Sequence, residues 1–317
     1  MKNKLLLVAF ILCMGILGST VSAKDLKVLM IGNSYSICVG WSLPFLVQAY
    51  PEHRLELTSA YIGACSLKRH ADNIKAAQED PEKGQYGITV WNSAVKGSSE
   101  RYSGNLIDLL KKKRYDIVTI QQASKFSWKW DSYEPYAGEL IAFIRQCQPD
   151  AEIVIQQTWS YRSDEPLLQS FGFDQNEMYN RLRDAYAKLA EKYKLRVIPM
   201  GDAVQLFRKY TPVKYQPPAE KTFEYPKVPS NQGDVVGSAT WNQDPSNRKM
   251  SVDRIHLNRN GRYLQACLWF SFLYGEPIDK ITWVLEGVSQ DSAVLLRRCA
   301  KEALEAYPQT AGKNEKK

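Results

Sequence analysis

The sequence predicts an α/β fold, a three-layer α/β/α sandwich with a mostly parallel central sheet. The main observation is that short apolar runs alternate with longer segments of helical periodicity, which is the pattern of parallel strands joined by helices. The composition agrees, because 44% hydrophobic and 24% charged residues are typical of a globular domain. The 317 residues are enough for one large core, and no repeat or linker divides them.

Buried strands are expected where short apolar runs end in turn residues. The first run, residues 26–31, is followed by Gly32 and Asn33, whose residue types favour a turn. Residues 86–97 could add a short strand within an insertion. The other strands are expected at 54–60, 115–121, 151–157 and 194–200.

Helices are expected between and after these strands. Residues 175–193 place Leu182 and Leu189 two helical turns apart on one apolar face. Pro44 suits the first turn of a helix over 41–50, because proline fits where an N–H has no partner. The remaining long helices are expected at 133–147, 258–274 and 289–307.

The first 23 residues have the composition of a secretory signal peptide. Lys2 and Lys4 form a positive region, residues 5–17 are apolar, and small residues end the segment at Ala23. This pattern predicts an exported bacterial protein, either periplasmic or secreted. The apolar stretch is shorter than a membrane span, so no stable membrane span is expected.

Residues 24–310 are expected to form a single domain, with a long loop insertion at about 211–250 and a disordered tail at 311–317. The formal net charge is +8, but the basic residues are spread out, apart from Lys111–Arg114 and the Lys-rich tail. A nucleic-acid-binding protein concentrates such residues in a stripe or a recognisable module. No nucleic-acid partner is therefore expected.

The cysteine and histidine patterns argue against a metal site. The cysteines that follow the signal peptide have no Cys-x-x-Cys spacing, and no His-x-His or His-Glu-x-x-His motif is present. No metal and no cofactor is therefore expected. His53 and His70 are expected in solvent. A disulfide between Cys38 and Cys65 stays open, and the full set is Cys38, Cys65, Cys147, Cys267 and Cys299.

Two segments near opposite ends of the domain carry residues suited to nucleophilic catalysis. Ser34 follows the first strand, at the sheet edge where open α/β folds bind ligands. Asp253 and His256 stand three apart on an expected loop before the helix at 258–274. The carboxylate can hold imidazole Nδ1–H, which leaves Nε2 to accept a serine proton. Each segment alone could be a turn or a helix cap, but together they predict a catalytic triad.

Gly32-Asn33-Ser34 and Asp253-x-x-His256 together resemble the two end blocks of the SGNH (GDSL-like) hydrolases. The resemblance implies an SGNH/flavodoxin-like fold, a serine nucleophile at Ser34 and no cofactor. It also implies that the backbone amides of Ser34 and Gly63 belong to an oxyanion hole, which an amide side chain at a later strand exit completes.

That later block departs from the family pattern Gly-x-Asn-Asp. This chain has Gln121 and Gln122 there, and it looks like an exported bacterial branch with a Gln-containing third block. Successive strand residues point to opposite faces, so one glutamine is expected to face the serine. Gln121 is the preferred candidate and Gln122 the alternative.

The expected function is a serine esterase that removes an acyl group, with acetyl favoured, from a carbohydrate or polysaccharide. Aromatic and amide side chains suit sugar rings, although aromatic residues pack cores as readily as sites. Two alternatives stay open, a non-catalytic glycan-binding protein on the same fold and a lipase-like esterase. The candidate substrate-binding residues are Asn33, Tyr35, Trp159 and Trp241.

Overall fold

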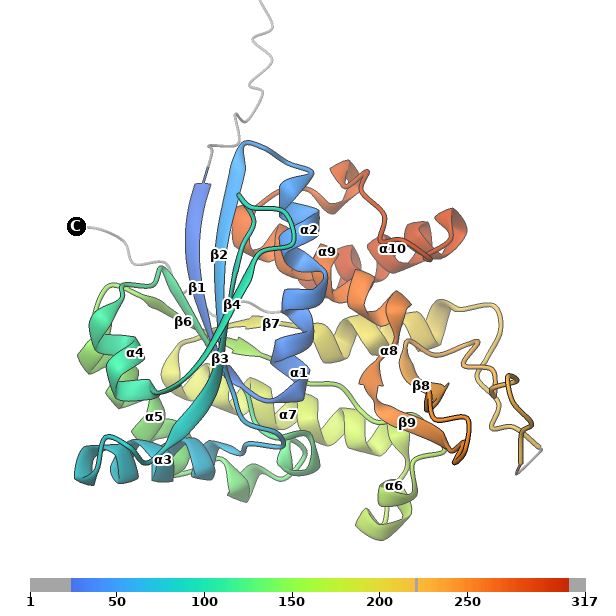
Figure 1. Cartoon of the computed structure of the whole chain (residues 1–317), viewed down its shortest axis with the longest axis horizontal. Coiled ribbons are helices and arrows are strands. Elements are labelled where there is room, and N and C mark those ends of the chain that lie inside the picture. Colours follow the sequence, from blue (N-terminus) through green and yellow to red (C-terminus); the bar gives the residue numbers. More distant parts are fainter. Residues whose placement is uncertain (1–23, 220–221, 308–317) are drawn as a thin grey trace, which may run out of the picture.

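A seven-stranded sheet forms the centre of the computed structural model, which describes residues 24–219 and 222–307 (Figure 1). The expected signal peptide and the expected tail at 311–317 lie outside these residues. The strand order is β4-β3-β2-β1-β5-β6-β7, and β2, β1, β5, β6 and β7 run parallel. The predicted α/β class with a mostly parallel sheet is confirmed.

The parallel strands begin and end close to the expected positions, whereas β4, β8 and β9 were not expected. The strands are β1 (Lys24–Gly32), β2 (His53–Tyr61), β3 (Gln85–Asn92), β4 (Ser99–Asn105), β5 (Ile117–Ile120), β6 (Glu152–Gln156), β7 (Arg196–Ile198), β8 (Val236–Trp241) and β9 (Met250–Leu257). The central parallel strands are buried on both faces over most of their length, which explains the continuous apolar runs of β1, β5 and β6.

Helices and short 3-10 turns connect the strands. The helices are α1 (Ser34–Ile37), α2 (Leu43–Gln48), α3 (Leu67–Glu79), α4 (Leu106–Lys112), α5 (Tyr136–Cys147), α6 (Pro166–Phe171), α7 (Gln175–Tyr193), α8 (Met200–Tyr210), α9 (Arg259–Tyr274) and α10 (Gln290–Ala306). The 3-10 turns are η1 (Cys38–Trp41), η2 (Ser124–Phe126), η3 (Trp130–Ser132) and η4 (Ile278–Lys280). In the part of the chain that is described, no helix is both long and apolar enough to cross a membrane.

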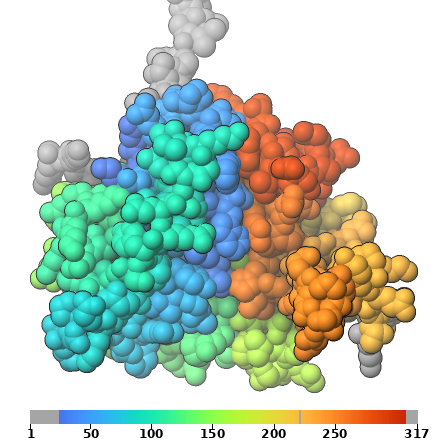
Figure 2. All heavy atoms as spheres, viewed as in Figure 1, coloured from blue at the N-terminus to red at the C-terminus, as the bar shows by residue number. Residues whose placement is uncertain are grey.

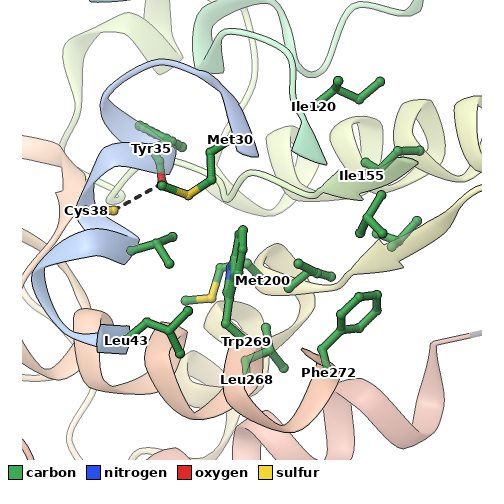
Figure 3. Close-up of a cluster of buried hydrophobic side chains, with 14 of the residues drawn as sticks. Met30, Tyr35, Cys38, Leu43, Ile120, Ile155, Met200, Leu268, Trp269 and Phe272 are labelled. Carbon is green, nitrogen blue, oxygen red and sulfur yellow. Dashed lines mark hydrogen bonds between the residues drawn. The ribbon is translucent and has the colours of Figure 1, made fainter. Parts of the chain in front are cut away.

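The helices form a layer on each face of the sheet. In Figure 1, α3, α4 and α5 lie on one side of β1 and β2, while α2, α9 and α10 lie on the other. Figure 3 shows Trp269 of α9 and Met200 of α8 packed in a common core with strand residues Met30 and Ile155. Most residues of α9 are buried, as expected of a helix in which few polar residues follow the first turn.

Two antiparallel strands extend the sheet beyond β2. The sequence offered at most one short strand at 86–97, but β3 pairs with β2, and β4 pairs with β3. The residues of β4 are mostly polar and exposed, so they show no apolar run from which a strand could be predicted. Figure 2 shows this teal hairpin beside the blue α1–α2 segment on one face of the molecule.

A second, two-stranded sheet changes the interpretation of the expected insertion. Residues 211–219 and 222–235 are irregular, but β8 lies within the 211–250 range and pairs antiparallel with β9. Asp253 and His256 therefore lie on strand β9, and the prediction that a loop carries them was wrong. The sequence of β9 shows no clear alternation of apolar and polar residues from which a strand could be predicted, because most of its residues are only half-buried.

Candidate active site

Ser34 lies at the carboxyl end of β1, where the chain turns into α1. Asn33 caps this helix, since its Oδ1 accepts a hydrogen bond from the N–H of Tyr35 at 3.1 Å. Asn33 Nδ2 donates to the carbonyl of Cys65 at 3.0 Å, which joins this turn to the loop after β2. The buried Asn33 thus fixes the turn that presents Ser34, and it contacts protein groups where a substrate contact was expected.

The side chains of Ser34, His256 and Asp253 form one hydrogen-bonded chain. Ser34 Oγ lies 2.8 Å from His256 Nε2, although 222 residues separate them in sequence. His256 Nδ1 lies 2.7 Å from Asp253 Oδ2. This arrangement assigns the proton of the neutral imidazole to Nδ1 and leaves Nε2 to accept the hydroxyl proton.

A bulge in β9 directs His256 toward Ser34. On β8 a single residue, Gly237, faces three residues of β9, 254–256. Gly237 has a φ of +94°, and a Cβ at this position would collide with the guanidinium of Arg162. Bulges re-aim side chains, and this one brings the N–H groups of Ile255 and His256 within 2.8 and 2.9 Å of Asp253 Oδ1.

These hydrogen bonds determine the ionisation of Asp253. Partial burial raises the pKa of this carboxyl, but the His256 ring and the amides of His256 and Ile255 outweigh burial and lower the pKa to about 2. Asp253 is therefore a carboxylate at neutral pH and can stabilise a protonated His256.

Tyr35 and Trp159 support the segment that carries His256. Tyr35 Oη donates to the carbonyl of Ile255 at 2.8 Å, and Trp159 Nε1 donates to the same carbonyl at 2.9 Å. Their rings stack with centroids 4.0 Å apart, and both are buried. The expectation that they contact substrate does not fit this burial, because the core encloses them. They position the residue next to His256.

Neither glutamine of the third block points an amide at the serine hydroxyl. Gln121 Nε2 donates to Asn33 Oδ1 at 2.7 Å, so Gln121 lies behind the Asn33 turn. Gln122 Oε1 accepts from the N–H of Leu67 at 3.0 Å, and its Nε2 donates to the carbonyl of Ser132. The two side chains diverge as the alternation predicts. Their buried contacts do not fit the expected role in an oxyanion hole, because protein acceptors already hold both amides.

Two backbone amides remain available beside Ser34. The N–H of Ile62 donates to the carbonyl of Gly32, which places the exposed Gly63 next to the serine turn. In the described part of the chain, the N–H groups of Ser34 and Gly63 donate to no protein acceptor. They are the candidate donors to a developing negative charge.

A cavity of about 550 Å³ opens beside Ser34, between the β3–β4 hairpin, α1–η1 and the β9–α9 segment. Figure 2 shows these three segments side by side on one face. The side chains on its walls were not predicted from the sequence, although an arginine in the first turn of the otherwise mostly apolar α9 was a visible signal. Those walls include Trp41, Tyr61, Thr89, Arg101, Tyr102 and Arg262.

Trp241 lies outside this cavity. Its indole Nε1 donates to the carbonyl of Lys227 at 2.8 Å, and its ring packs edge-on against Tyr225. It stabilises the segment between α8 and β8, so a substrate contact in this cavity does not fit its position.

The two other histidines are buried, against the expectation that they are solvated. His70 lies 2.9 Å from the hydroxyl of Tyr86, and burial followed by the charge of Arg69 lowers its pKa to about 3. His53 stacks on Tyr274 at the amino end of β2. Both histidines have polar neighbours in the sequence, which suggested exposed positions. Their burial comes from packing against residues that are distant in the sequence.

Cys38 and Cys65 are both free thiols, so no disulfide joins them. In residues 24–219 and 222–307, one group has the composition of a metal site, formed by Glu52, His53 and Glu276. It lies at the amino end of β2, which is the end of the sheet away from Ser34.

Comparison with known proteins identifies a family to which the sequence is similar. The model of a domain of unknown function, DUF4886, matches residues 27–215. No curated protein matches the chain. The crystal structure of a DUF4886 family protein from Bacteroides uniformis is 24% identical, with a TM-score of 0.71 over 89% of this chain and 96% of that chain. That similarity shows a shared fold.

Other solved structures are more distant. An alpha/beta hydrolase enzyme from the metagenome of Lake Arreo, Spain, is 14% identical, with a TM-score of 0.46 over 79% of this chain and 95% of that chain. An acetylxylan esterase from Geobacillus stearothermophilus is 14% identical, with a TM-score of 0.37 over 58% and 80%. Since the family model covers more than half of the sequence, the chain belongs to the DUF4886 family.

Proposed function

We propose that the protein is a serine hydrolase of carboxylic esters. The observation that carries the proposal is the hydrogen-bonded chain from Ser34 through His256 to Asp253, with distances of 2.8 and 2.7 Å. A serine hydroxyl is a weak nucleophile unless an oriented base removes its proton, and this chain supplies both the base and the group that orients it. A protein that only binds glycans has no chemical need for all three residues.

In the proposed reaction, Ser34 Oγ attacks the ester carbonyl while His256 Nε2 takes the hydroxyl proton. The C–O bond to the alcohol breaks as His256 returns the proton to the leaving oxygen, which gives an acyl-serine and the free alcohol. Water then attacks the acyl-serine, with His256 again acting as the base, and the acyl group leaves as a carboxylic acid.

The tetrahedral oxyanion needs donors that are already in place. The N–H groups of Ser34 and Gly63 are free of protein acceptors, and they lie on adjoining turns that Asn33 joins. Two backbone donors form the oxyanion hole in several hydrolases. Gln121 acts indirectly in this proposal, because it holds Asn33 Oδ1 and thus the turn.

The proposed substrate is an O-acylated carbohydrate, with acetyl as the favoured acyl group. Trp41 and Tyr102 line the cavity and are 43% and 45% exposed, so their rings are accessible to a sugar. The two end blocks resemble the SGNH (GDSL-like) hydrolases, which agrees with ester hydrolysis. In this proposal the protein is exported by a signal peptide at residues 1–23, and residues 24–310 form a single domain.

The test compares wild type with Ser34→Ala on p-nitrophenyl acetate, followed by release of acetate from acetylated polysaccharides. We expect turnover by wild type and its loss in Ser34→Ala with an unchanged melting temperature. Equal activity of the two proteins would refute the triad. Tight binding of an acetylated glycan without any turnover would identify a glycan-binding protein.

A further inference from the structure

Two arginines line the cavity beside Ser34 without a carboxylate partner. Arg262 comes from the first turns of α9, and Arg101 comes from β4 on the facing hairpin. In the described ranges, no aspartate or glutamate lies within 4.0 Å of either guanidinium. Asp253 also lines the cavity, but His256 and two backbone amides occupy its oxygens. The cavity therefore holds two unpaired positive charges.

Arg262 packs against Trp41 on the wall of the cavity. Its guanidinium lies over the ring of Trp41, with the central carbon 4.6 Å from the ring centroid. Its Nε is buried and has no hydrogen-bond acceptor among the described residues. A buried donor without a partner is costly, and such a group in a cavity is expected to find its acceptor in a ligand.

Several other arginines that are at least partly buried in this protein do have carboxylate partners. Arg208 pairs with Asp234 at 3.0 Å, and Arg162 pairs with Asp164 at 2.6 Å. The unpaired state of Arg262 is therefore not a general property of arginines in this fold.

We propose that Arg262, together with Arg101, binds a carboxylate of the substrate and makes the protein selective for acyl esters of acidic sugars. This inference rests on the proposed ester hydrolysis and adds the charge class of its substrate. A guanidinium donates two parallel hydrogen bonds to a carboxylate, an interaction that neutral sugars cannot replace. The aromatic side chains of the cavity would then contact the sugar ring, while the arginines bind its carboxylate.

The experiment uses two substrates that differ only in this group, the mono-O-acetate of a methyl glucoside and that of the matching methyl glucuronide. The readout is the ratio of kcat/KM for the glucuronide to kcat/KM for the glucoside, because a ratio is insensitive to the fraction of folded enzyme. Wild type should favour the glucuronide at least about tenfold, which corresponds to about 1.4 kcal/mol.

Arg262→Gln should reduce this ratio by about 10- to 100-fold, mainly through a higher KM for the glucuronide, and Arg101→Gln should reduce it less. Arg262→Lys should retain part of the preference, since it keeps the charge but loses the bidentate geometry. Arg259→Gln is the matched control. Arg259 lies in the same helix turn outside this cavity, where Nη1 donates to the carbonyl of Glu286, and its variant should keep the wild-type ratio.

Two outcomes would overturn the inference. The first is a wild-type ratio near one, and the second is an equal ratio in wild type and Arg262→Gln. Turnover of p-nitrophenyl acetate by the same proteins shows whether the proposed ester hydrolysis occurs. A failure of the charge selectivity can then be told apart from a failure of the proposed function. If no ester is hydrolysed, calorimetry tests the inference by binding. It compares the affinity for the acetylated glucuronide of Ser34→Ala with that of the double variant Ser34→Ala/Arg262→Gln. Equal affinities would refute the inference.

Discussion

At the scale of single residues, Asp253 combines two tasks in one carboxylate. Oδ2 accepts the Nδ1–H of His256, while Oδ1 accepts two backbone amides of the β9 bulge. The same contacts lower the pKa of Asp253 to about 2 although burial opposes this. Asp253 thus stays ionised at neutral pH and can stabilise a positive charge on the imidazole ring of His256.

Asp253→Asn should lower kcat by about 10³- to 10⁴-fold while the fold is retained. The asparagine Oδ1 can still accept the two amides, but an Nδ2 group facing the ring forces the tautomer in which Nε2 carries the proton. Steady-state kinetics on p-nitrophenyl acetate measure the loss, and circular dichroism checks the fold. A loss smaller than tenfold would show that Asp253 does not orient the base.

His70 should make stability depend on pH. Burial lowers its pKa to about 3, below the ordinary histidine value of about 6.5. The unfolded chain therefore binds one more proton than the folded chain between these values. The free energy of unfolding falls as pH decreases below about 6.5, by about 1.4 kcal/mol per unit.

The variant His70→Gln removes this titration and keeps a polar side chain beside Tyr86. Urea unfolding of both proteins between pH 7 and 5 should show the wild type losing about 1 to 2 kcal/mol more than the variant. Carboxylates titrate alike in both proteins and cancel in the difference. Parallel curves would mean that His70 is accessible to protons in the folded state.

At the scale of elements, the orientation of β9 depends on the α1 segment and on the loop after β6. Tyr35 and Trp159 both donate to the carbonyl of Ile255, which is otherwise released from the ladder by the bulge. Two donors from separate elements therefore fix the residue that precedes His256. Small displacements of a catalytic base are costly because proton transfer requires hydrogen-bond contact.

Tyr35→Phe should reduce kcat by about 10- to 100-fold with little change in KM. Tyr274→Phe is the matched control, since its buried hydroxyl also donates to a backbone carbonyl, that of Arg54 at 2.8 Å, at the other end of β2. Both variants should lose about 1 to 3 kcal/mol of stability. Equal kcat values for the two variants would reduce Tyr35 to a structural role.

At the scale of the whole molecule, one buried ion pair joins distant segments behind the site. Arg208 of α8 contacts Asp234, which precedes β8, at 3.0 Å, and its Nη1 donates to Ser160 Oγ after β6 at 2.6 Å. Asp234 also accepts from Asn258 at the start of α9 through its carbonyl. The small β8–β9 sheet is thereby attached to the central domain.

Arg208→Met should lower the free energy of unfolding by about 3 to 5 kcal/mol, because it leaves the carboxylate of Asp234 buried without a positively charged partner. Adding Asp234→Asn should restore part of the loss. Arg298→Met, which breaks an exposed pair with Glu302 on α10, should leave the denaturation midpoint nearly unchanged. Urea titrations compare the three, and similar midpoints for Arg208→Met and Arg298→Met would contradict the argument.

Periodicity and turn chemistry were enough to predict the parallel strands, the helix over 175–193 and the turn that presents Ser34. These features depend on residues close in sequence, and local patterns report them faithfully. The pairing of Ser34 with Asp253 and His256 also followed from the sequence, because each motif stands at the edge of a predicted element.

Only the tertiary structure decided which partners the remaining side chains have. Gln121 faces Asn33, Tyr35 is buried under β9, and Arg101 and Arg262 converge on one cavity from segments about half the chain apart. β4 was missed because its polar residues form a strand only when β3 is present to pair with it. The sequence by itself determined the residue types that can do the chemistry and the local turns that expose them. Packing determined which of these side chains are free to meet a substrate, since burial and pairing depend on neighbours that local sequence does not specify.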